Sequence, residues 1–131
     1  MAIKARIHRE EKYVTSLPII IDIMPTCMAL GNVAYPKTFS HADLPGTNLL
    51  PAITDQSIHK RTLYFEHQSS CAIIEGNWKL VRADRNSQWE LIDLDKDPFE
   101  THDLSATYPD KVEELESKWI EWANTHKVFP P

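Results

Sequence analysis

The sequence of 131 residues has only three glycines and two cysteines. It contains no Gly-x-Gly-x-x-Gly run, no Walker loop and no Gly-x-Ser-x-Gly elbow, so the common signatures of dinucleotide, nucleoside triphosphate and α/β-hydrolase sites are missing. The longest apolar run, residues 17–21 with Pro18 inside it, is far too short to cross a bilayer. We therefore expect no membrane partner.

Positive charge is scarce as well. The sequence has fourteen Lys and Arg residues and nineteen Asp and Glu residues, which gives a net charge of -5. The basic residues are interspersed with acids. A nucleic-acid-binding protein needs a basic face or stripe, so we expect no nucleic-acid partner. The N-terminus lacks the apolar core and the small-residue cleavage site of a signal peptide. We therefore predict no particular cellular location from the sequence.

The two cysteines, Cys27 and Cys71, form no Cys-x-x-Cys arrangement, and no Cys and His spacing matches a zinc site. They could form a disulfide in an oxidising compartment. A domain of this size does not need such a cross-link to fold, which favours two buried free thiols.

The N-terminal part, residues 1–61, is predicted to hold a polar lead-in, one short helix and a long irregular connection. Asp22 is expected to cap a helix over residues 22–30, with Pro25 in its first turn and Gly31 as the left-handed residue that ends it. Prolines punctuate residues 32–61, where one turn of helix is expected near residues 48–53.

The C-terminal part, residues 62–131, shows regular signals. Short runs of β-branched and aromatic residues predict four strands, at residues 62–67, 71–75, 78–82 and 89–94. The connections between them are short enough to join only antiparallel neighbours, and Gly76-Asn77 suits a two-residue hairpin turn. The result is an antiparallel meander.

The last segment predicts a long helix over residues 110–126, where apolar residues recur at spacings of three and four. An isolated helix of this length is marginal in water, so its apolar stripe must pack on one face of the sheet. The fold class is therefore α+β: a four-stranded antiparallel sheet packed against one long C-terminal helix, preceded by a short N-terminal helix and a long irregular connection.

Few residues suggest a binding site. His67, at the end of the first strand beside Glu66, could carry a proton or contact an anion, although an ordinary surface histidine is the simpler interpretation. Asp93, Asp95 and Asp97 have the spacing that begins a calcium loop, but Pro98 and Leu104 occupy the positions that need Gly and Glu. We expect a capped turn there and no metal site.

The tryptophans could form an aromatic platform for sugars, but core packing accounts for most of them. Trp119 and Trp122 fall on the helix stripe, while Trp78 and Trp89 alternate with polar neighbours as a half-buried sheet requires. The other histidines have no partner at a diagnostic spacing; they are His8, His41, His59, His102 and His126.

Six segments, taken together in their order along the chain, resemble a known protein family. They are residues 21–26 (Ile-Asp-Ile-Met-Pro-Thr), 46–51 (Gly-Thr-Asn-Leu-Leu-Pro), 72–81 (Ala-Ile-Ile-Glu-Gly-Asn-Trp-Lys-Leu-Val), 89–94 (Trp-Glu-Leu-Ile-Asp-Leu), 97–100 (Asp-Pro-Phe-Glu) and 103–104 (Asp-Leu). In their order and spacing they resemble the C-terminal end of type I, arylsulfatase-like sulfatases. The resemblance implies a subdomain that docks on a larger α/β catalytic domain, where it can help to complete a substrate pocket through residues such as His67 and Glu66.

The catalytic motif of that family is absent. Type I sulfatases use a Cys or Ser in a Cys/Ser-x-Pro/Ala-x-Arg run, oxidised to formylglycine beside a calcium ion, and no run in this sequence matches it. The resemblance thus implies a sulfuric ester hydrolase region that is inactive alone, with calcium held in the missing catalytic domain and no catalytic residue here. A free-standing interaction module derived from a sulfatase is the alternative, in which a second copy replaces the catalytic domain as partner.

Overall fold

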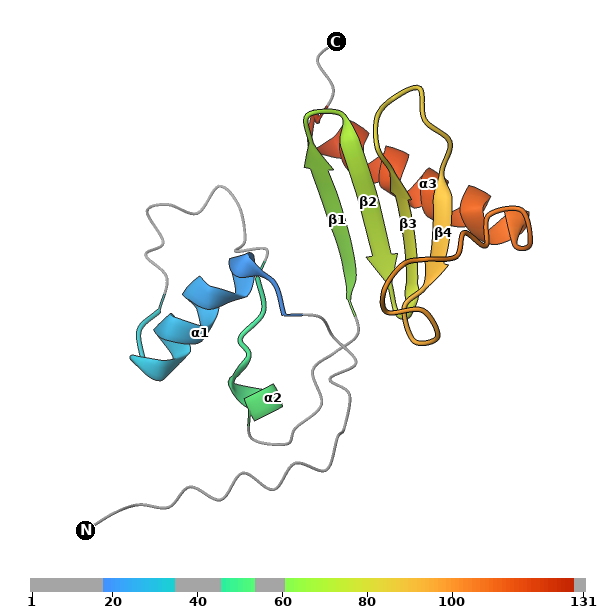
Figure 1. Cartoon of the computed structure of the whole chain (residues 1–131). Helices are drawn as coiled ribbons and strands as arrows, with labels where there is room; N and C mark the ends of the chain where they lie inside the picture. The colour runs from blue at the N-terminus through green and yellow to red at the C-terminus, as the bar shows by residue number, and fades with distance from the viewer. Residues whose placement is uncertain (1–17, 35–45, 54–60, 129–131) are drawn as a thin grey trace. The chain divides into compact units, whose positions relative to one another are not determined.

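The computed structural model describes residues 18–34, 46–53 and 61–128, and the chain divides into two compact units, Met1–His59 and Lys60–Pro131 (Figure 1). The predicted lead-in and three of the histidines, His8, His41 and His59, lie outside the described residues. The α+β class is confirmed. None of the helices in the described part is long and apolar enough to span a membrane.

The second unit contains the sheet, whose strands are β1 (Thr62–His67), β2 (Ser70–Glu75), β3 (Trp78–Arg82) and β4 (Glu90–Asp93). They lie in the order β1-β2-β3-β4, and all neighbours are antiparallel, as predicted. The first turn differs from the prediction because Ser70 belongs to β2. Only Gln68 and Ser69 connect β1 with β2, and both have positive φ angles, 50° and 76°. In the second turn Gly76 has the positive φ, 63°.

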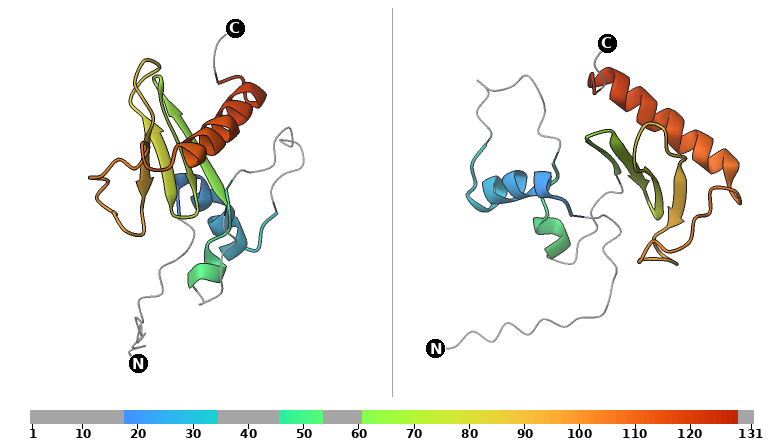
Figure 2. Two further views of the ribbon diagram at one scale, coloured as in Figure 1. Left: turned by 90° about the vertical axis from the view of Figure 1, so that its right-hand side faces the viewer. Right: turned by 45° about the horizontal axis from the view of Figure 1, so that its top comes forward.

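Helix α3 (Pro109–Thr125) lies across one face of this sheet, as the turned views in Figure 2 show. The register aligns Tyr64, Ile73, Leu80 and Leu91 in one row that faces the helix. Three helix residues that pack against this row have no exposed surface: Leu115 and Trp119 of the predicted stripe, and Ala123, which the stripe did not include. The indole N–H of Trp119 also donates to the Phe65 carbonyl at 3.1 Å, so the helix is fixed to β1 by a directional bond as well as by apolar contact.

The outer edge of β4 is covered by the segment that leads to α3. The Leu91 N–H donates to an Asp103 carboxylate oxygen at 2.9 Å, and the Leu104 N–H donates to the Leu91 carbonyl at 2.8 Å. Burial alone would raise the pKa of Asp103, but hydrogen bonds from Leu91 and Ser105 outweigh it and the pKa is lowered. The charged carboxylate therefore closes this edge of the sheet.

The turn after β4 is organised by Asp93, which is 2% exposed. Its carboxylate accepts hydrogen bonds from the Asn77 side chain at 2.7 Å and from the Asp95 N–H at 3.3 Å, and Lys96 pairs with it at 2.8 Å. The bonds from Lys96 and Asn77 lower the pKa of Asp93. The expected capped turn is confirmed.

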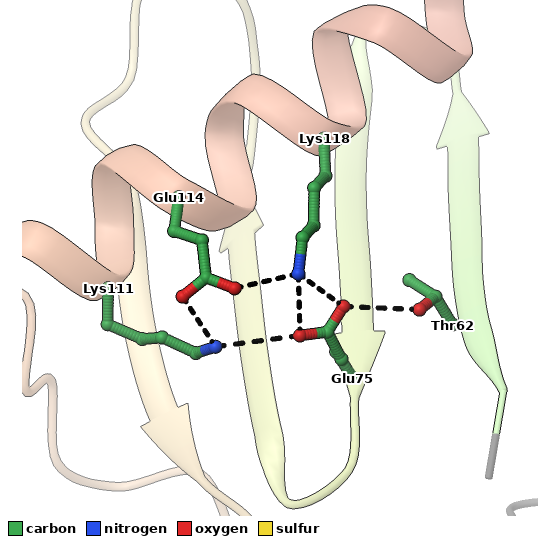
Figure 3. A network of polar contacts seen from close by, with 5 residues as sticks. All are labelled: Thr62, Glu75, Lys111, Glu114 and Lys118. Atoms are coloured by element: carbon green, nitrogen blue, oxygen red, sulfur yellow. Dashed lines mark hydrogen bonds and ion pairs between the residues drawn. The ribbon is translucent and has the colours of Figure 1, made fainter.

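A network of charges joins α3 to the sheet on one flank of the core (Figure 3). Lys118 donates to both carboxylate oxygens of Glu75 at 2.8 Å and to Glu114 at 2.7 Å. Lys111 pairs with Glu114 at 2.9 Å and with Glu75 at 3.5 Å, and Thr62 donates its hydroxyl to Glu75. The network fixes where along β2 the helix lies.

The first unit contains a 3-10 turn, η1 (Ile20–Asp22), helix α1 (Ile23–Leu30) and the short helix α2 (Leu50–Ile53). Asp22 precedes α1 as predicted, but its side chain does not cap that helix. The fully buried carboxylate accepts the Ile19 N–H at 2.9 Å and the Thr47 N–H at 2.8 Å, so it ties the helix start to a segment far along the chain.

Two further expectations for α1 are wrong. Gly31 has a φ of -80°, and the left-handed residue that follows the helix is Asn32, with a φ of 51°. Cys27 is a free thiol but is exposed, whereas Cys71 is free and buried. Cys27 is exposed because α1 buries none of its residues within the described structure, even though its sequence has no charged residue.

The charge network generates a testable dependence of stability on pH. Hydrogen bonds from Lys118 and Lys111 lower the pKa of Glu114 to about 2, and the bond from Lys118 lowers that of Glu75. A carboxyl whose pKa is lower in the folded state stabilises the fold above its unfolded pKa, about 4.3, and loses that contribution as the pH falls toward the folded value.

We therefore expect Glu75→Gln to lower the free energy of unfolding at pH 7, with the difference from wild type shrinking as the pH is lowered from about 4.5 toward 2. Urea unfolding followed by tryptophan fluorescence measures this, because all four tryptophans lie in the second unit. Glu113→Gln, on the exposed side of the same helix, is the matched control. A pH-independent difference between Glu75→Gln and wild type would contradict the expectation.

Candidate functional site

An open cavity of about 500 Å³ lies along β1 in the second unit. Four successive residues of that strand line it, from Tyr64 to His67, together with the start of β2 and the C-terminal end of α3. The volume falls within the range of small-molecule sites in proteins. The full lining consists of Tyr64, Phe65, Glu66, His67, Ser70, Cys71, Ala72, Val81, Trp122 and Val128.

Both residues that the sequence singled out, His67 and Glu66, line this cavity. His67 is the last residue of β1, pairs with Ser70 across the turn, and has an exposed side chain. Glu66 accepts a hydrogen bond from the Ser69 N–H at 3.1 Å, which closes the turn. The carboxylate thus holds the backbone that positions the imidazole.

Aromatic rings form the wall of the cavity on the helix side. Tyr64 and Trp122 stack with ring centroids 5.1 Å apart and planes within 6°, and His126 stacks on Trp122 at 5.0 Å. Burial raises the pKa of Tyr64, so its hydroxyl remains a neutral hydrogen-bond donor well above physiological pH. The sequence predicted that Trp122 packs in the core, and the structure shows it packed against the core while one side borders the cavity.

A buried thiol lies at the back of the cavity. The Cys71 sulfur accepts a hydrogen bond from Arg82 Nε at 3.0 Å, and the Arg82 guanidinium lies 4.5 Å from the Trp89 ring centroid and 5.7 Å from that of Trp119. This stack explains why an arginine is accommodated on the helix-facing side of the sheet. Core packing of Trp78, Trp89 and Trp119 is confirmed.

The described residues offer no cluster of three or more His, Cys, Asp or Glu side chains that could hold a metal ion. Two carboxylates of the calcium-like turn and one that follows it accept hydrogen bonds from protein groups. Asp93 and Asp103 bind the amides described above, and Asp97 accepts the Thr101 and His102 N–H groups at 2.6 and 2.8 Å. These groups therefore do not fit the calcium site of a sulfatase.

Chemically, this arrangement offers groups that can bind a ligand. The cavity combines an aromatic wall, an exposed imidazole and a serine hydroxyl whose hydrogen bond goes to the Ala83 carbonyl at 2.6 Å.

Comparison with known proteins shows that the chain is similar to part of several sulfatases. No family model matches the chain. An uncharacterized sulfatase of Schizosaccharomyces pombe is 30% identical over 123 residues, which cover 86% of this chain and 22% of that protein. The structure of Ps i-CgsB, solved in complex with k-i-k-neocarrahexaose, superposes with a TM-score of 0.63 at 26% identity and covers 78% of this chain and 23% of that one.

A 2-O GAG sulfatase shares the fold at a TM-score of 0.57 and 21% identity, with 81% of this chain and 24% of that chain covered. The predicted resemblance is confirmed: the chain is similar to one part of sulfatases, consistent with their C-terminal subdomain. It spans less than a quarter of the length of each of these relatives.

Proposed function

We propose that the chain is the C-terminal region of an arylsulfatase-like sulfuric ester hydrolase, inactive alone, which supports a catalytic domain that lies outside this sequence. The observation that carries the proposal is the combination of sulfatase similarity with the absence of any Cys/Ser-x-Pro/Ala-x-Arg run. In the proposed enzyme, the catalytic domain supplies the formylglycine and the calcium ion.

The surface of the first unit supports this role. Helix α1 has no charged residue and buries none of its side chains within the described structure, and a helix that is apolar on all sides is normally buried. A surface of this kind marks an interaction site. Six large apolar residues of the segment are exposed: Ile20, Ile21, Ile23, Met24, Leu30 and Val33.

We further infer that the cavity along β1 completes the substrate pocket of the proposed enzyme. His67 can donate a hydrogen bond to a sulfate-ester oxygen, and Glu66 holds the turn that carries it. The aromatic wall of Tyr64 and Trp122 would face the organic part of the ester. His67 is thereby the substrate-binding residue, and Glu66 acts as a positioning residue.

The alternative is a free-standing interaction module that has kept the fold without the chemistry. One observation on the second unit favours this alternative. Its core residues Leu115, Trp119 and Ala123 are fully buried by residues of this chain, with no catalytic domain present.

A segment exchange tests the supporting role. In a sulfatase relative that hydrolyses 4-nitrophenyl sulfate in the presence of calcium, we expect this activity to be lost when the matching segment is deleted, and to be regained when this chain is joined in that place. The full-length relative is the positive control. Retention of full activity by the deleted form would show that the segment supports nothing, and would favour the free-standing module.

The same exchanged enzyme tests His67. We expect His67→Ala to lower kcat/KM by roughly 10-fold or more, since a hydrogen bond to a charged group contributes about 1.5–3 kcal/mol. His102→Ala, an exposed histidine in the loop after β4, is the control and should leave kcat/KM unchanged. Equal effects of the two substitutions would remove His67 from the substrate pocket.

A further inference from the structure

The outer edge of β1 has backbone groups without a strand partner among the described residues. Because His67 and Ser70 flank a two-residue turn, the hydrogen-bonded pairs of the hairpin are His67 with Ser70, Phe65 with Ala72 and Leu63 with Ile74. The N–H and C=O groups of the alternate residues, Thr62, Tyr64 and Glu66, therefore point away from the sheet.

The two edges of the sheet are treated differently. The edge of β4 is covered by Asp103 and Leu104, which take the N–H and the carbonyl of Leu91. Strand β1 contains no proline, no lysine and no bulge in its pairing with β2, and Glu66 is its only acidic residue. The open cavity lies along this edge, so space for another strand is available there.

The sequence of β1, Thr-Leu-Tyr-Phe-Glu-His, is complementary to itself in the antiparallel direction. When two copies are aligned with Tyr64 opposite Tyr64, each Thr62 lies opposite a Glu66 and each Leu63 opposite a Phe65. This register places all the outward-pointing residues in hydrogen-bonded pairs and sets no two like charges opposite each other. It also covers Phe65, which is 37% exposed.

We propose that β1 pairs with β1 of a second copy of this chain, about a two-fold axis at Tyr64, to form one continuous antiparallel sheet across the two copies. The covered edge of β4 stops further addition of strands, so the assembly closes as a dimer and does not extend into a fibre. This inference concerns the chain by itself and does not rest on the proposed function.

Hydrogen exchange of the intact chain at increasing concentration tests the pairing directly. The amides of Tyr64 and Glu66 are expected to exchange more slowly as the concentration rises from the micromolar to the millimolar range, while those of Leu63 and Phe65 stay equally protected throughout. Sedimentation equilibrium of the same samples should show the mass rising from 15.1 kDa to twice that value. A mass of one copy at every concentration would overturn the proposal, as would a dimer in which the Tyr64 and Glu66 amides keep their exchange rates.

A pair of variants at one position separates the backbone from the side chain. Glu66→Pro removes an outward N–H and is expected to weaken dimerisation by about 10-fold or more, because proline at a strand edge blocks pairing on that side. Glu66→Ala removes the same carboxylate but keeps the N–H, and should change the dissociation constant by less than about 3-fold. Equal dissociation constants for the two variants would contradict strand pairing. If Glu66→Pro does not fold, the exchange pattern of the wild-type chain decides.

Discussion

The packing of α3 on one face of the sheet is the interaction on which the rest of the structure depends. A single helix of this length is marginal in water, and burying Leu115, Trp119 and Ala123 against Ile73, Leu80 and Leu91 gives the helix and the sheet one shared core. The bond from Trp119 to Phe65 and the charges around Glu75 then fix the position of the helix. The cavity forms where Trp122, near the C-terminal end of that helix, and Val128, which follows it, lie beside residues of β1.

Three carboxylates of the chain have structural roles: Asp93 organises a turn, Asp103 covers an edge, and Asp22 joins two segments of the first unit. Our two proposals rest on two surfaces of the described part, which are the exposed apolar helix α1 and the outer edge of β1.

Features that depend on local periodicity could be predicted from the sequence. Alternation of apolar and polar residues predicted the strands, the apolar stripe predicted α3, and the end of the first strand predicted the position of His67. Features set by long-range contacts could not. Asp22 accepts a hydrogen bond from the Thr47 N–H, which no local capping pattern indicates. The turn at Gln68 and Ser69 is local, but its positive φ angles occur without glycine, so the usual sequence signal of such a turn is missing. The participation of Trp122 in a cavity wall requires knowing where the end of α3 lies over β1. Exposure of Cys27 was missed because the pattern of α1 describes a buried helix.

The central proposal is that this chain is the C-terminal region of an arylsulfatase-like hydrolase and is inactive alone. The most direct measurement is the rate of 4-nitrophenyl sulfate hydrolysis by the purified chain in the presence of calcium, beside an active formylglycine-bearing sulfatase. The account predicts a rate equal to that of buffer alone at every chain concentration. Hydrolysis that rises in proportion to the concentration of the chain would contradict it.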